Sequence, residues 1–148
     1  MANIVFNVAL GRLAHYASLP AASDALVAVP LEATGLETDA ALRDRDTLAD
    51  VLAGATNEQT TMGRKTLTSV TVSVDDATDR LAVDSADITW TAASGNPVGA
   101  LVVCYDPDTG TGTDVDLVPL LKLDCSLTPD GSDFTAVVTD LVRVTSTA

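Results

Sequence analysis

Segment 114–128 alternates between apolar and polar residues over almost its whole length, and this pattern constrains the fold more than any other feature. A repeat of two residues places one side of an extended strand in the core and the other side in water. The segment therefore predicts a long strand with one buried face. Its odd positions carry Val115, Leu117, Pro119, Leu121, Leu123, Cys125 and Leu127, and its even positions include Asp114, Asp116, Lys122, Asp124, Ser126 and Thr128.

Two residues depart from this alternation. Val118 and Leu120 are apolar at even positions, on the face that is expected to be wet. They flank Pro119, which has no backbone N–H to donate to a sheet and therefore suggests an edge strand or a bulge. Either Val118 and Leu120 form a contact between subunits, or a second layer of the same chain covers this face. The sequence leaves both alternatives open.

Shorter segments repeat the same two-residue period between turn residues, which is typical of antiparallel hairpins. In contrast, "GALVVCY" at 99–105 is almost uniformly apolar, as expected of a strand that is covered on both faces. We expect this strand, together with Trp90, at the centre of the core. The other predicted strands lie at 4–10, 25–33, 70–74, 81–83, 88–90, 134–138 and 142–144.

One segment has helical spacing instead. "DTLADVLAG" predicts a short helix near residues 47–53, with Asp46 as its N-cap and Gly54 as a left-handed C-terminal cap. A further helical turn at 40–43 is equally compatible with a solvated loop. At 148 residues the chain is long enough for one domain with a proper core and too short for two. The fold class expected for residues 1–148 is mainly β, a single-domain antiparallel sandwich or flattened barrel.

The charge balance narrows the possible partners. The chain has 21 acidic and 8 basic residues, a net charge of −13, which repels nucleic acid and anionic lipid. It has no apolar run near the roughly 20 residues that span a membrane, and its start lacks the features of an export signal. We therefore expect a soluble protein with no nucleic-acid or membrane partner. Cys104 and Cys125 could form a disulfide, but we expect them to be free, buried thiols in a reducing compartment.

The aspartates and glycines of 106–116 raise the question of a calcium loop. An EF-hand loop needs oxygen ligands at positions one, three and five, glycine at six and glutamate at twelve. Counted from Asp106, position three is Asp108, but positions five, six and twelve are Gly110, Thr111 and Leu117. We therefore predict an exposed hairpin loop with no metal and no cofactor.

Catalytic signatures are weak. His15 is the single histidine, and the adjacent Asp75 and Asp76 lie in a predicted turn where aspartate is common anyway. We predict that the protein is not an enzyme and has no catalytic residues. Arg64 and Lys65 form a basic pair in an acidic chain, and we interpret them as an ordinary surface pair or as a contact with a partner's carboxylates.

Several phrases, taken together and in this order, resemble virion structural proteins of tailed bacteriophages of actinobacteria and similar hosts. Within that group the chain is similar to capsid decoration proteins, also called minor capsid or cement proteins. The resemblance spans nearly the whole chain, but it consists of strand and turn phrases without catalytic content. The phrases are "MANIVFNVALGR", "DTLADVLAG", "VDDATDR", "ITWTAA", "LVVCYDPDTGTGTD" and "TPDGSD".

The resemblance implies a single capsid-decoration-like domain over 1–148, made in the host cytoplasm and bound to the capsid exterior. It implies a homotrimer at local three-fold positions, with the major capsid protein as its partner. On this reading Val118 and Leu120 are candidate subunit contacts, and Arg64 and Lys65 are candidate capsid contacts. Two alternatives stay open: a phage tail or head-completion protein, and a calcium-dependent adhesion module.

Overall fold

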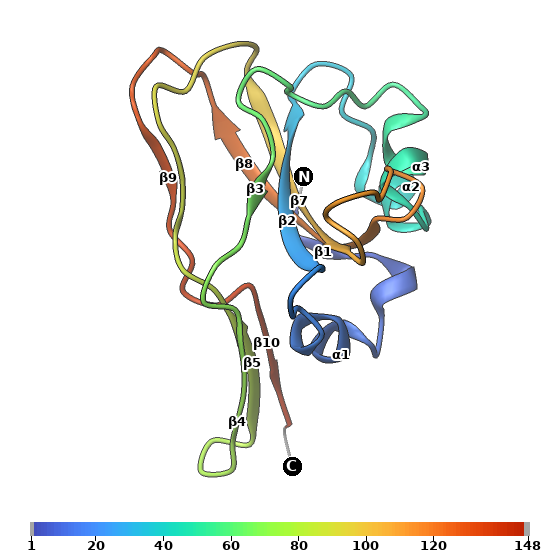
Figure 1. Ribbon diagram of the computed structural model, residues 1–148, viewed down its shortest axis with the longest axis vertical. Coiled ribbons are helices and arrows are strands. Elements are labelled where there is room, and N and C mark those ends of the chain that lie inside the picture. The colour runs from blue at the N-terminus through green and yellow to red at the C-terminus, as the bar shows by residue number, and fades with distance from the viewer. Residues whose placement is uncertain (1, 147–148) are drawn as a thin grey trace.

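The computed structural model describes residues 2–146 and shows a mainly β protein whose strands form three antiparallel sheets with few short helices, consistent with a β sandwich (Figure 1). The predicted fold class is thereby confirmed. The largest sheet has five strands in the order β1 (Ile4–Val5), β8 (Val118–Leu127), β7 (Val98–Asp106), β2 (Ala25–Glu32) and β3 (Lys65–Thr66). The second has the order β10 (Val142–Thr145), β5 (Arg80–Asp84) and β4 (Thr71–Asp75), and the third pairs β6 (Ile88–Trp90) with β9 (Phe134–Ala136).

Strand β7 lies at the centre of the core, as its uniformly apolar sequence predicts. Its alternate residues enter two apolar clusters on the two faces of the five-stranded sheet: Leu101 and Val103 belong to one, Val102 and Cys104 to the other. The first cluster also holds side chains of the two smaller sheets, among them Trp90, which is 1% exposed. The second holds the apolar residues of two short helices. The central sheet is therefore covered on both faces.

The helices are α1 (Leu13–Ser18), α2 (Asp39–Arg43) and α3 (Leu48–Leu52), with a 3-10 turn η1 at Asn7–Ala9. Helix α3 confirms the position predicted near 47–53, but both of its predicted caps are wrong. Thr47 is the N-cap, in a reciprocal capping box with Asp50. The C-cap is Ala53, which has a right-handed conformation, and Gly54 does not have a positive φ, so Gly54 is not a left-handed cap.

The N-terminal strand is much shorter than the predicted 4–10. Only Ile4 and Val5 pair with β8, after which Phe6 inserts fully into the core and the chain turns into η1. Gly11 then adopts a φ of 74°, a left-handed conformation that suits glycine, just before α1. His15, the single histidine, is an exposed residue of α1.

Strand β8 contains the bulge that Pro119 suggests. Val103 lies opposite Leu121 and Cys104 lies opposite Pro119, so Leu120 is an extra residue on β8. The bulge breaks the alternation, and Leu120 and Leu121 are both buried, at 1% and 4% exposure. Leu120 is covered by its own chain, which is the second of the two alternatives that the sequence left open. Val118 is half-buried against the same cluster.

Candidate interaction surface

The three-stranded sheet projects from the rest of the molecule as an arm, which we define as residues 71–84 and 142–145 (Figure 1). The turn between β4 and β5 forms its tip. There the Asp75 carboxylate accepts hydrogen bonds from the Thr78 hydroxyl at 2.7 Å and the Ala77 N–H at 2.9 Å. These bonds, chiefly the one from Thr78, lower the pKa of Asp75. These hydrogen bonds stabilise the tight turn that the residues "DDATD" predict.

The strand register divides one face of the arm into two apolar rows. The inner row joins Val72, Val83 and Val142, and Val83 is only 1% exposed. The outer row joins Val74, Leu81 and Val144, nearer the tip. Val74 is 69% exposed and Val144 is 59% exposed. The body of the protein covers the inner row and leaves the outer row largely in water.

An apolar groove with a volume of about 210 Å³ continues this surface toward α1. Gly11, Leu13 and Ala14 line one side of the groove, and Leu81, Val142 and Val144 line the other. The groove and the outer row form one apolar strip along the arm. Exposed apolar strips of this kind on a soluble protein are typical of surfaces that bind another molecule.

Strand β4 is an open edge of the arm. Within residues 2–146 its one neighbouring strand is β5. Natural edge strands are usually protected by lysine, proline, a bulge or a covering loop. The sequence of β4, "TVSVD", has neither lysine nor proline, and its register with β5 is continuous. Helix α1 contacts β4, but within residues 2–146 no second strand pairs with it.

The charge around the arm is mainly negative. Asp75, Asp76 and Asp79 surround the tip, where Arg80 is the nearest cation in the register. Within residues 2–146, four of the eight basic side chains form ion pairs with acidic side chains, and one of the four is Arg143 of the arm. The ion pairs join Arg45 to Glu37, Arg64 to Glu58 and Asp114, Lys122 to Asp39 and Asp124, and Arg143 to Asp140.

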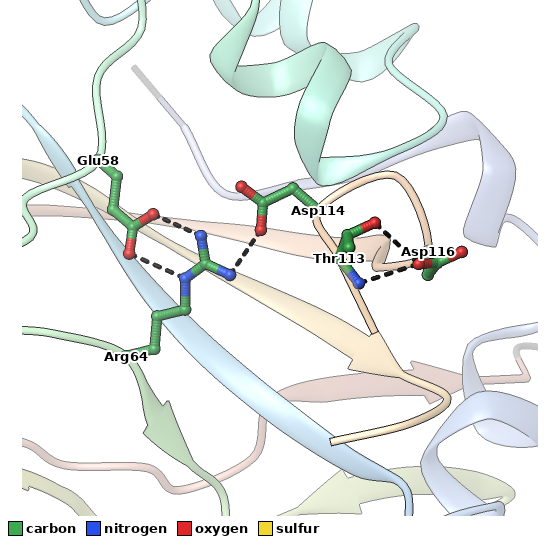
Figure 2. Close-up of polar contacts among 5 residues, drawn as sticks. All are labelled: Glu58, Arg64, Thr113, Asp114 and Asp116. Carbon is green, nitrogen blue, oxygen red and sulfur yellow. Dashed lines mark hydrogen bonds and ion pairs between the residues drawn. The ribbon is translucent and has the colours of Figure 1, made fainter. Parts of the chain in front are cut away.

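Arg64, a predicted capsid contact, forms an internal clamp (Figure 2). Its Nε and Nη2 atoms donate to the two carboxylate oxygens of Glu58 at 2.9 and 2.6 Å, and its Nη1 donates to Asp114 at 2.7 Å. The hydrogen bonds to Glu58, followed by the one to Asp114, raise the pKa of Arg64. The clamp joins the segment before β3 to the β7–β8 loop, which uses up much of this guanidinium's capacity to bind a partner.

Lys65 differs from Arg64. It lies on β3 opposite Ala28, is half-exposed, and has no ion pair with another residue of the described part of the chain. Lys65 on β3 and Val118 on β8 belong to the five-stranded sheet, so neither forms a common site with the arm. Both stay predictions as contact residues.

The aspartate-rich segment is a β7–β8 hairpin connection, as predicted. Asp108 accepts hydrogen bonds from the N–H groups of Gly110 and Thr111 at 2.9 and 3.2 Å and from the Thr111 hydroxyl at 2.6 Å. The Thr111 hydroxyl contributes most to the lowered pKa of Asp108. Asp116 likewise accepts from the N–H and hydroxyl of Thr113, both at 2.9 Å (Figure 2). Across residues 2–146, no three or more His, Cys, Asp or Glu side chains group in a way that could hold a metal ion.

The two cysteines are free, as predicted. Cys104 is buried, and burial raises the pKa of its thiol. Cys125 is only half-buried, in part contrary to expectation, and burial raises its pKa to about 11. The two thiols lie in contact with different apolar clusters, on opposite faces of the central sheet.

Sequence reasoning missed the outer row. Val74 and Val144 each fit a predicted strand, but their joint exposure depends on how β4, β5 and β10 pair and on where the body ends.

Comparison of the chain with protein-family models, with curated proteins and with solved structures gives no match. None of the helices within residues 2–146 has the length and apolar character needed to cross a membrane.

Proposed function

We propose that this chain is a structural virion protein that binds the outer surface of a phage capsid and reinforces contacts between major capsid protein subunits. The observation that carries the proposal is the projecting arm, on which an apolar outer row stays exposed beside an open strand edge. A surface of that kind gains free energy when a partner covers it, and it requires no chemical reaction.

The rest of the molecule is suited to a cementing role. The Arg64 clamp and the hydrogen-bonded β7–β8 loop fix long connections against the body, so that little conformational entropy is lost on binding. The net charge of −13 suits the exterior of a capsid better than an interior that faces DNA. The sequence resemblance to decoration proteins points to the same location.

We further propose a homotrimer at local three-fold positions. Closed symmetry presents identical patches to a symmetric shell, and three linked weak contacts bind much more tightly than one. Val118 and Lys65 remain our proposed residues for subunit and capsid contacts, respectively.

A cryo-EM reconstruction of the particle that carries this protein tests the proposal. We expect density for the chain on the outer capsid surface, repeated at the local three-fold positions, and its loss from particles that lack the gene. Density only at the tail or portal would favour the tail or head-completion alternative. Density inside the shell against DNA would also overturn the decoration assignment.

A further inference from the structure

We propose that the open β4 edge of the arm binds an extended, basic polypeptide segment, which adds a strand to the sheet. The inference deepens the proposed function and rests on it for one point, namely that the bound segment belongs to a capsid partner. The surface itself is defined by the geometry of the arm.

Backbone geometry gives the first reason. Residues Thr71–Asp75 are extended and are paired on one side with β5, and Thr71 and Ser73 are exposed on the polar face. A strand added to such an edge gains main-chain hydrogen bonds along its length. The proposed mode of binding therefore requires no change in the fold.

The outer apolar row gives the second reason. A strand beside β4 places alternate side chains on the face that carries Val74, Leu81 and Val144. An aliphatic side chain of the bound segment would then extend this row and cover Val74, whose side chain is 69% exposed. Valine, isoleucine or leucine at alternate positions fits this face.

The charge at the tip of the arm indicates that the bound segment should also carry basic side chains. The end of β4 carries Asp75, and the exposed Asp76 and Asp79 follow in the turn. Lysine or arginine beside the aliphatic positions would be attracted to these carboxylates, whereas an acidic segment would be repelled. The preferred occupant is thus basic as well as aliphatic.

A second copy of this chain fits the edge less well. Each copy has a net charge of −13, and pairing two β4 edges would bring two acidic arms together. The strand is also only five residues long. Such a contact is much smaller than the roughly 1,200 Å² that stable protein interfaces bury.

The test uses the isolated full chain and a synthetic peptide in which lysine and valine alternate. Backbone amide resonances of the protein are followed by NMR during titration with the peptide. We expect the largest shifts within Thr71–Asp75 and weaker binding as salt concentration rises. The same peptide with glutamate in place of lysine should not bind.

Two variants separate the apolar and charged contributions. Val74→Ser should weaken binding about tenfold, since the hydrophobic gain from burying one valine corresponds to about that factor in Kd. Asp76→Asn combined with Asp79→Asn should weaken binding and flatten its salt dependence. Val115→Ser is the matched control, because Val115 is 64% exposed but lies in the β7–β8 loop, and it should bind as the wild type does.

The inference is overturned if the peptide causes no shift at millimolar concentration, or if the shifts lie outside the arm. It is also overturned if sedimentation shows a dimer that Val74→Ser dissociates, because the occupant would then be a second copy. These results are independent of where a particle reconstruction places the protein. Failure of the inference is therefore distinguishable from failure of the proposed function.

Discussion

The Nζ atom of Lys122 lies 2.8 Å from Oδ1 of Asp39, although the Lys122 side chain is fully buried in the middle of β8. Asp39 is the first residue of α2, and its other carboxylate oxygen accepts a hydrogen bond from the Ala2 N–H at 2.8 Å. Asp124 lies farther from the same ammonium group, at 3.4 Å. Asp39 therefore joins the N-terminal segment and α2 to the central sheet.

Removing Asp39 should destabilise the protein more than removing the lysine charge. Asp39→Ala leaves a buried ammonium group with only the more distant Asp124, and should lower the free energy of unfolding by about 2–3 kcal/mol. Lys122→Met keeps most of the buried volume and leaves Asp39 partly in water, so we expect a loss of about 1 kcal/mol or less. Urea unfolding of both variants and of the double variant measures the difference. Equal losses in the two single variants would contradict this account.

The same pair predicts a pH dependence. The hydrogen bond from Lys122, followed by the one from the Ala2 N–H, lowers the pKa of Asp39 below its ordinary value of 3.8. A carboxylate with a lowered pKa in the folded state stabilises the fold above its unfolded pKa, and the stabilisation is lost as pH falls through the folded value. Other aspartates also have lowered pKa values, so wild type must be compared with Lys122→Met. We expect the difference in Tm between wild type and Lys122→Met to narrow below about pH 4. A difference that stays constant down to pH 2 would contradict a role of the Lys122–Asp39 pair in the pH dependence.

The apolar exceptions on β8 give a prediction about packing. Leu120→Ser should lower the free energy of unfolding by about 3–5 kcal/mol, because it leaves a cavity and buries a hydroxyl group. Val118→Ser should cost about 1 kcal/mol, because Val118 is only half-buried. Thermal unfolding of the two variants checks this. An unchanged Tm for Leu120→Ser would place Leu120 at a surface and restore it as a possible subunit contact.

Local patterns predicted the elements whose environment is uniform along their length. The apolar run of β7 indicated cover on both faces, and the spacing of Leu48, Val51 and Leu52 indicated α3. The bulge at Leu120 was harder to locate, because it depends on the pairing between β7 and β8. The early end of β1 likewise depends on Phe6, which fills a space that other segments create.

The contacts that hold the candidate surface in place could not be predicted from local sequence. Arg64 and Asp114 are 50 residues apart in the chain, and their ion pair forms only after the β7–β8 loop folds against the segment before β3. The exposure of Val74 and Val144 similarly follows from the register of three strands and from the extent of α1. The composition predicted partners that are not anionic, but it gave no position for the surface.

The last prediction concerns calcium and the β7–β8 loop. The oxygens of Asp108 are already hydrogen-bonded within the loop, so a cation would have to displace these bonds. Millimolar calcium should therefore change the Tm of the isolated protein by no more than an equal ionic strength of sodium chloride does. A specific ligand at about 100 times its Kd would add about 2.7 kcal/mol, or several degrees in Tm for a domain of this size. The decisive comparison is with Asp106→Asn combined with Asp108→Asn, using Asp76→Asn as a control at an unrelated turn. A calcium-induced rise of several degrees that disappears only in the loop variant would show a real site and would favour the adhesion-module alternative.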